Sequence, residues 1–228
     1  VVGAAIATLM ARLVECFIII IVVALKVKPL NLSFKQLVTF DRLMAGMLYQ
    51  AAFPVVLNEA CWGLTNITYN IIYGRMGVNA IATTQITTTI MNLFMIVVFG
   101  MAHASVVVIG NEIGANQEEQ AIIYAKKIIR LALIIAVVMA VGLVLFAPAI
   151  VGIYKVSDLV RQNAIQILYI FAIFMLPRVY NGVQIVGILR GGGDAKYGSI
   201  VQGLSMWIFG IPFGIIGAFI FKWPITYV

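Results

Sequence analysis

The sequence predicts an all-α integral membrane protein, built as a polytopic bundle of helices. Of its 228 residues, 63% are hydrophobic and only 10% are charged, and the mean hydropathy is +1.09. An ordinary soluble domain carries roughly 25% charged residues. Apolar stretches long enough to cross a bilayer recur along the chain. The short segments of alternating hydrophobicity that are typical of a membrane barrel do not occur, so helices are expected to form the spans.

The chain divides into a first helix (1–25), a basic connector (26–44) and a larger bundle (45–228). Arg12 and Glu15 lie three positions apart in the first helix, and we expect them to form an ion pair. The connector contains a capping-box pattern, which predicts a short amphipathic helix at the membrane surface.

Five further spans follow the connector, over residues 45–74, 80–109, 121–153, 159–189 and 197–221. The turn between the first two of these is very short, so they are expected to lie antiparallel and side by side. Ser157 precedes the span that begins near Leu159, where a serine is typical of a helix N-cap. Gly210, Pro212 and Gly214 are expected to break the last span.

The basic residues between spans fall unequally on the two sides of the membrane. The larger group comprises Lys26, Lys28, Lys35, Arg42, Lys126, Lys127, Arg130, Arg190 and Lys196, and the smaller group Arg75, Lys155, Arg161 and Lys222. Cytoplasmic loops carry the excess of lysine and arginine. We therefore expect a multi-pass protein of the plasma membrane, with 26–44 and the loops near 110–120 and 190–196 in the cytoplasm. Topology explains the net charge of +7 better than binding to nucleic acid does.

One polar side of the second span is the leading candidate for a functional site. It carries Glu59, the only carboxylate between Asp41 and Glu112. Steps of three or four residues place Trp62, Asn66, Tyr69 and Tyr73 on the same side of the helix. A charge in hydrocarbon costs roughly 2.5–3.5 kcal/mol, so this side is expected to face a cavity or the bundle interior. Glu59 is then either a structural carboxylate or a site for a proton or cation.

The neighbouring spans carry further candidates for a substrate cavity. Gln85 and Asn92 share one face of the third span with Thr88, although hydrogen bonds between helices are the simpler role for the threonines. Arg178 and Asn181 lie in the middle of the fifth span.

The Arg178 side chain is expected to point into the bundle, because a guanidinium stays charged and needs an acceptor at that depth. The candidate acceptors are Glu59, Asn66, Asn181 and helix carbonyls freed by Pro177.

Several kinds of enzyme and cofactor site lack support. His103 is the single histidine, and Cys16 and Cys61 have no paired spacing, so neither a hydrolytic triad, a metal site nor a disulfide is indicated. The glycines after Arg190 follow no strand and match no phosphate-binding motif, so they are read as a tight turn. We expect neither an enzyme nor a bound cofactor.

Three motifs, in order and at matching spacing, resemble a known family. They are Pro54-Val-Val-Leu-Asn-Glu59, Ile109-Gly-Asn-Glu-Ile-Gly-Ala115 and Ile188-Leu-Arg-Gly-Gly-Gly-Asp194. Together they are similar to the C-terminal half of a multidrug and toxic compound extrusion (MATE) transporter. The chain begins with Val and stops where another span starts, so we expect an internal piece of a longer protein.

The resemblance implies two six-helix lobes that rock to give alternating access. Residues 1–25 would be the last helix of the N-terminal lobe and 45–228 the C-terminal lobe, truncated in its final helix. Members export organic cations and other amphipathic compounds in exchange for H⁺ or Na⁺. Glu59 matches a coupling carboxylate of part of the family. The second carboxylate of some sodium-coupled members is missing here, so the ion stays open.

The expected partners are therefore the lipid bilayer, a small organic substrate and the N-terminal lobe. Two alternative functions stay open. A lipid-linked saccharide flippase of the same superfamily should have a strongly cationic cavity, whereas Arg178 is the only mid-span base near the proposed one. A non-transporting membrane scaffold would use the polar side chains only to hold helices together.

Overall fold

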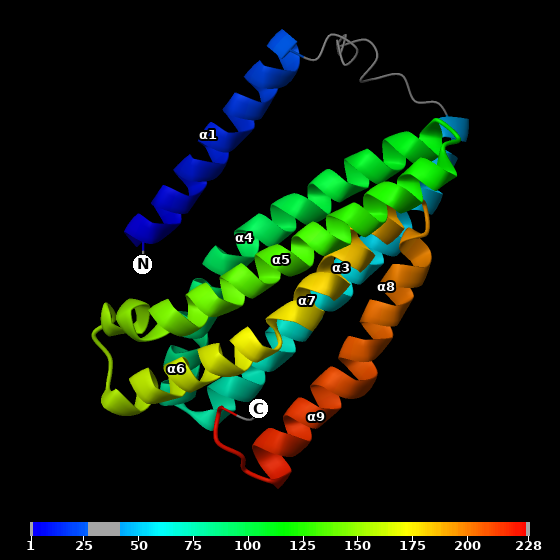
Figure 1. Cartoon of the computed structure of the whole chain (residues 1–228). Coiled ribbons are helices and arrows are strands. Elements are labelled where there is room, and N and C mark those ends of the chain that lie inside the picture. Colours follow the sequence, from blue (N-terminus) through cyan, green and yellow to red (C-terminus); the bar gives the residue numbers. More distant parts are fainter. Residues whose placement is uncertain (1, 27–41, 227–228) are drawn as a thin grey trace. The chain divides into compact units, whose positions relative to one another are not determined.

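A computed structural model describes residues 2–26 and 42–226 of the chain (Figure 1). These residues form two units, Val1–Tyr49 and Gln50–Val228, and each is described by itself. The predicted connector and its amphipathic helix fall largely on residues 27–41, outside the described residues. The predicted division of the chain at residues 25 and 44 therefore stays a prediction.

Every regular element of the described residues is a helix. Their bounds are α1 (Val2–Lys26), α3 (Arg42–Met76), α4 (Val78–Gly114), α5 (Glu118–Gly152), α6 (Asp158–Ile173), α7 (Met175–Gly182), η2 (Val183–Leu189), α8 (Ala195–Leu204), η3 (Ser205–Gly210), α9 (Ile211–Ile215) and η4 (Ile216–Ile220). The segments labelled η have π-helical hydrogen bonding.

Length and composition qualify four described helical segments as membrane spans: α1, α4, α5 and residues 195–220. The bent pair of α6 with α7–η2 makes a fifth. The 35-residue α3 is long enough but is not in this group, because its interior carries Asn58, Glu59, Asn66 and Asn70. The prediction of an all-α polytopic membrane protein is confirmed, and α3 is its most polar long helix.

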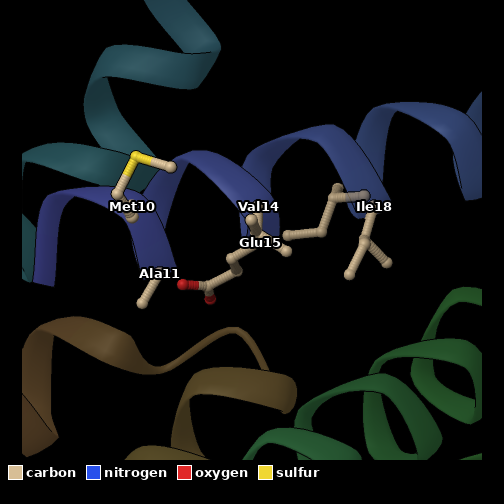
Figure 2. Close-up of a pocket in the computed structure, with 6 residues that line it drawn as sticks. Met10, Ala11, Val14, Glu15 and Ile18 are labelled. Atoms are coloured by element: carbon tan, nitrogen blue, oxygen red, sulfur yellow. The ribbon is translucent and has the colours of Figure 1, made fainter. Parts of the chain in front are cut away.

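The first unit contains the whole of one apolar helix, α1, and the first residues of α3. On α1, Arg12 Nη1 donates to Glu15 Oε2 at 2.7 Å, which confirms the predicted pair. Figure 2 shows a shallow hollow on the flank of α1, where Met10, Val14 and Ile18 follow one another along the helix and the Glu15 carboxylate projects beside them. Most of the α1 side chains are exposed.

The core of the second unit lies between α4, α5, α6 and α7. Figure 1 shows α4 and α5 running along each other, as their many contacts require. Ile90, Leu143, Leu168 and Met175 are fully buried where these helices meet. Burial of one such side chain stabilises the fold by about 1.5–3 kcal/mol. The main core cluster of the described residues contains no residue of α3.

The fifth predicted span is broken near its middle. The helix axis turns by 59° between α6, which ends at Ile173, and α7, which begins at Met175. Pro177 explains the break, since it has no N–H to offer the Ile173 carbonyl and its ring clashes with that carbonyl. Ser157 caps α6 as predicted, with its side chain accepting from Val160 N at 3.5 Å.

The last span does not break where the sequence predicted. It continues from Ala195 to Ile220, and the hydrogen-bond register shifts to π-helical in η3 and η4 on either side of Pro212. A wider register accommodates the missing proline N–H without ending the helix. The third span also extends past its predicted end, because α4 continues to Gly114.

Candidate functional site

An ion pair joins α3 to the turn between η2 and α8. Arg190 Nη2 lies 2.9 Å from Glu59 Oε1 and 3.2 Å from Asn58 Oδ1, and it donates to both. Asn58 Nδ2 in turn donates to the Ser199 carbonyl of α8 at 3.3 Å. The Arg190 side chain is 17% exposed and that of Glu59 is 56% exposed. The guanidinium is therefore held in the protein, whereas the carboxylate stays open on one side.

The acceptor expected for Arg178 is absent among the described residues. The Arg178 side chain is exposed, and among the described residues its guanidinium has no hydrogen bond and no ion pair. It lies instead over the Phe171 ring, with its central carbon 4.6 Å from the ring centroid. The expected partner Glu59 is taken by Arg190. The physical reason is that Arg190 already pairs with Glu59, the one carboxylate in the interior of a described helix of this unit.

The buried side of α3 lies one residue away from the predicted polar stripe. Asn58, Thr65 and Ile72, spaced by seven residues, are the buried residues of the described part of α3. Within the stripe, Trp62 and Asn66 are exposed. One residue corresponds to about 100° of rotation around a helix, so the buried side of α3 is not the predicted stripe. Which side faces the bundle is decided by the neighbouring helices.

In the described part of the chain, two pairs of predicted site residues are in contact, both within α3: Asn66 Nδ2 donates to the Trp62 carbonyl at 2.8 Å, and the two tyrosines meet through their rings. The Tyr69 and Tyr73 rings stack, with centroids 5.9 Å apart and planes 19° apart. Tyr69 also packs against the last span: a Cβ on Gly210 would lie 3.1 Å from its hydroxyl, and one on Gly214 would lie 3.0 Å from Cε1. These glycines form a notch for the tyrosine ring, so Tyr69 has a packing role.

The α4 candidates stay apart from Glu59. Gln85 and Asn92 are exposed, and no described hydrogen bond links their side chains to α3. The threonines of α4 do not bond between helices as expected. Thr83 and Thr87 instead donate to carbonyls one turn earlier in their own helix, at 2.8 Å and 3.0 Å. A hydroxyl in a helix reaches its own i−4 carbonyl without help from a neighbour.

A comparison with protein families identifies the chain. The family model MatE matches residues 54–216, well over half of the sequence. The chain belongs to the MatE family. The resemblance drawn from the three motifs is thereby confirmed, and the matched region contains Glu59, Arg178 and Arg190.

Bacterial and animal proteins show the same relationship at low identity. The chain is 26% identical to the uncharacterized transporter YisQ of Bacillus subtilis, covering 92% of this chain and 46% of that protein. It is 28% identical to the probable multidrug resistance protein NorM of Bacillus cereus, covering 97% and 49%. The mouse multidrug and toxin extrusion protein 1 is 28% identical over 62% of this chain and 25% of its own length. The chain spans about half the length of the two bacterial relatives.

One solved structure shares the fold. It is that of a MOP superfamily transporter from Pyrococcus furiosus, with a TM-score of 0.73 at 19% identity over 78% of this chain and 39% of that one. At this identity the likeness shows the fold alone. The helical bundle of this MatE chain is therefore that of a known class of membrane protein.

Sequence reasoning missed Arg190 and Asn58 as partners of Glu59. The sequence predicts a tight turn at Arg190 and a basic residue on the cytoplasmic side, and it shows Asn58 only as a member of the first motif. The sequence contained one signal. Asn58 directly precedes Glu59 in the first motif, and Arg190 directly precedes the three glycines of the third motif. A buried base needs an acceptor, and the only carboxylate inside the bundle spans was Glu59.

Proposed function

We propose that this MatE chain forms the C-terminal half of a secondary antiporter, which exports drugs or other amphipathic or cationic organic compounds in exchange for H⁺ or Na⁺. Family membership and the names of the relatives support transport. The N-terminal lobe of the same protein would supply the other wall of the path, because alternating access requires one repeat to move against the other.

The observation that carries the proposal is the half-open carboxylate of Glu59. One of its oxygens accepts from Arg190 at 2.9 Å, and the carboxylate is 56% exposed. An incoming cation or proton would compete with the guanidinium for this charge. Loss of the pair would release α3 from the turn at Arg190, so binding of the coupling ion would be linked to helix movement.

The test is Glu59→Gln in the full-length protein. This change keeps the volume and most hydrogen bonds but removes the charge and the titration. We expect normal expression and insertion, together with loss of the drug efflux that an imposed proton or sodium gradient drives in proteoliposomes. Glu119→Gln is the matched control, because Glu119 lies exposed in the first turn of α5, at the end of that helix.

Full gradient-driven efflux by Glu59→Gln would contradict coupling at this site and move it to the other lobe. A scaffold without transport activity would show no gradient-driven efflux in the unmodified protein either, so the same experiment separates the two functions.

A further inference from the structure

Arg178 carries a full positive charge in the middle of the broken span. It lies between Asp158, at the start of α6, and Arg190, just after η2. Its side chain is exposed, and among the described residues it has neither an ion pair nor a hydrogen-bond acceptor. Its one described contact is the Phe171 ring, 4.6 Å from the guanidinium carbon.

This contact leaves the edge of the guanidinium free. The Phe171 ring offers no oxygen or nitrogen acceptor, so it takes up none of the guanidinium N–H donors, which point outward in the plane of the group. Those donors match two oxygens of a carboxylate or sulfonate, and such bidentate bonds are among the strongest hydrogen bonds in proteins. Arg178 therefore presents an uncommitted site for an anion.

Lipid does not satisfy this group. Hydrocarbon offers no acceptor, and intramembrane arginines face a bundle interior or a water-filled cavity. The 59° bend beside Arg178 supports the same orientation, because non-helical backbone at membrane depth occurs where it lines a cavity or is buried in protein. Broken spans of this kind form the substrate sites of many transporters.

Within the second unit, no described carboxylate pairs with the charge of Arg178. Glu59, the carboxylate on the interior of α3, is already neutralised by Arg190. The other described carboxylates of this unit lie at or beyond helix ends: Glu112, Glu118, Glu119, Asp158 and Asp194. No described group of the second unit therefore competes with an external anion for Arg178.

The surroundings of Arg178 are suited to the apolar part of a ligand. Phe174, four residues before Arg178 and on the same helical face, is 61% exposed. Asn181, three residues after Arg178, is exposed on that face and carries an amide with two donors and one acceptor. An aromatic surface, a cation and an amide thus follow one another along one side of the segment from Phe174 to Asn181.

We infer that this face binds amphipathic organic anions, with an aromatic body against Phe174 and a carboxylate or sulfonate on Arg178. The amide of Asn181 hydrogen-bonds a further polar group of the ligand. The inference rests on the proposed transport function and selects, among its amphipathic and cationic compounds, the amphipathic ones that carry a negative charge.

The test compares two dyes with the same ring system and opposite charge, sulforhodamine B (anionic) and rhodamine 6G (cationic). The full-length protein in proteoliposomes is expected to export sulforhodamine B in preference to rhodamine 6G. Arg178→Gln should lower sulforhodamine B export about tenfold or more, as expected for a lost charge-assisted hydrogen bond, without lowering rhodamine 6G export. Arg178→Lys should keep part of the sulforhodamine B export that Arg178→Gln loses. Arg161→Gln, a change at an exposed arginine near the start of α6, is the matched control.

A second measurement does not depend on transport. Binding of sulforhodamine B to the purified protein in lipid nanodiscs, followed by fluorescence anisotropy, should weaken by the same factor in Arg178→Gln. Export of rhodamine 6G without export of sulforhodamine B would overturn the inference and leave antiport intact. An equal loss of export of both dyes in Arg178→Gln, with unchanged anisotropy of sulforhodamine B, would also overturn the inference. Export of neither dye would count against the proposed function itself.

Discussion

The Glu59 carboxylate pairs with Arg190 and not with Arg178, the base at mid-span that the sequence offers as its partner. Arg190 reaches it because the turn after η2 lies level with the middle of α3, and Asn58 adds a second acceptor for the same guanidinium nitrogen. Arg178 makes no described contact with Glu59, and its guanidinium lies over the Phe171 ring instead. The Glu59 carboxylate, which the sequence presents as an isolated charge, thus belongs to a cluster with Asn58 and Arg190.

Removal of Arg190 should weaken the attachment of α3. Arg190→Gln leaves Glu59 without its cation, and we expect a cost of about 1 kcal/mol, at the low end for hydrogen bonds to charged groups because Glu59 is half exposed. The readout is the apparent melting temperature of the purified protein. The double variant with Glu59→Gln should recover part of the loss, as coupled neighbours do.

Arg161→Gln provides the comparison, since its contact with Asp158 is 3.9 Å long and exposed. A melting temperature for Arg190→Gln no lower than that of Arg161→Gln would show that the pair at Glu59 contributes nothing measurable.

At the level of elements, small residues decide how closely helices approach. Gly187 and Gly191 lie on the same side of η2 and the turn after it, one turn apart, and both face α4. Close packing between membrane helices depends on such small residues. By contrast, α3 is joined to the rest of its unit by particular contacts of Glu59, Asn58 and Tyr69 rather than by the main core. An element held in this way is suited to movement.

A methyl group at Gly191 should destabilise the bundle. Its Cβ would lie 2.9 Å from the Val106 carbonyl oxygen, and backbone on both sides leaves little room to adjust. We expect Gly191→Ala to cost about 1–3 kcal/mol, as overpacking does. Gly182→Ala, where nothing lies within 4 Å, is the matched control. Similar melting temperatures for the two variants would contradict this view of the α4 interface.

For the molecule as a whole, the unequal number of basic residues in the loops on the two sides predicts the orientation in the membrane. The loops near 110–120 and 190–196, on the side with the larger group of basic residues, are expected in the cytoplasm. Several helices are long and apolar enough to cross a bilayer, so each turn between them lies on one side or the other.

Labelling of single cysteines tests this orientation. In a protein whose Cys16 and Cys61 are replaced by serine, we introduce Gln117→Cys between α4 and α5, or Lys155→Cys between α5 and α6. A membrane-impermeant thiol reagent should label Lys155→Cys in intact cells, and Gln117→Cys only after the cells are permeabilised. Labelling of Gln117→Cys in intact cells would reverse the proposed topology.

Composition and local pattern were sufficient for the class of protein, the approximate helices and the family. Membrane-length apolar runs leave only helices as a solution, because backbone groups in lipid must bond within their own segment. The cap at Ser157 and the pair of Arg12 with Glu15 were equally predictable, since both depend on residues three positions apart. Local geometry decides such features before any helix meets another.

Tertiary structure decided the rest. The partner of Glu59 lies 131 positions away along the chain, and no periodicity connects the two. The buried side of α3, the exposure of Arg178 and the notch for Tyr69 likewise depend on where other helices lie. A helical pattern shows which residues share a face, but only packing against a neighbour determines which face is buried and which charge is left without a partner.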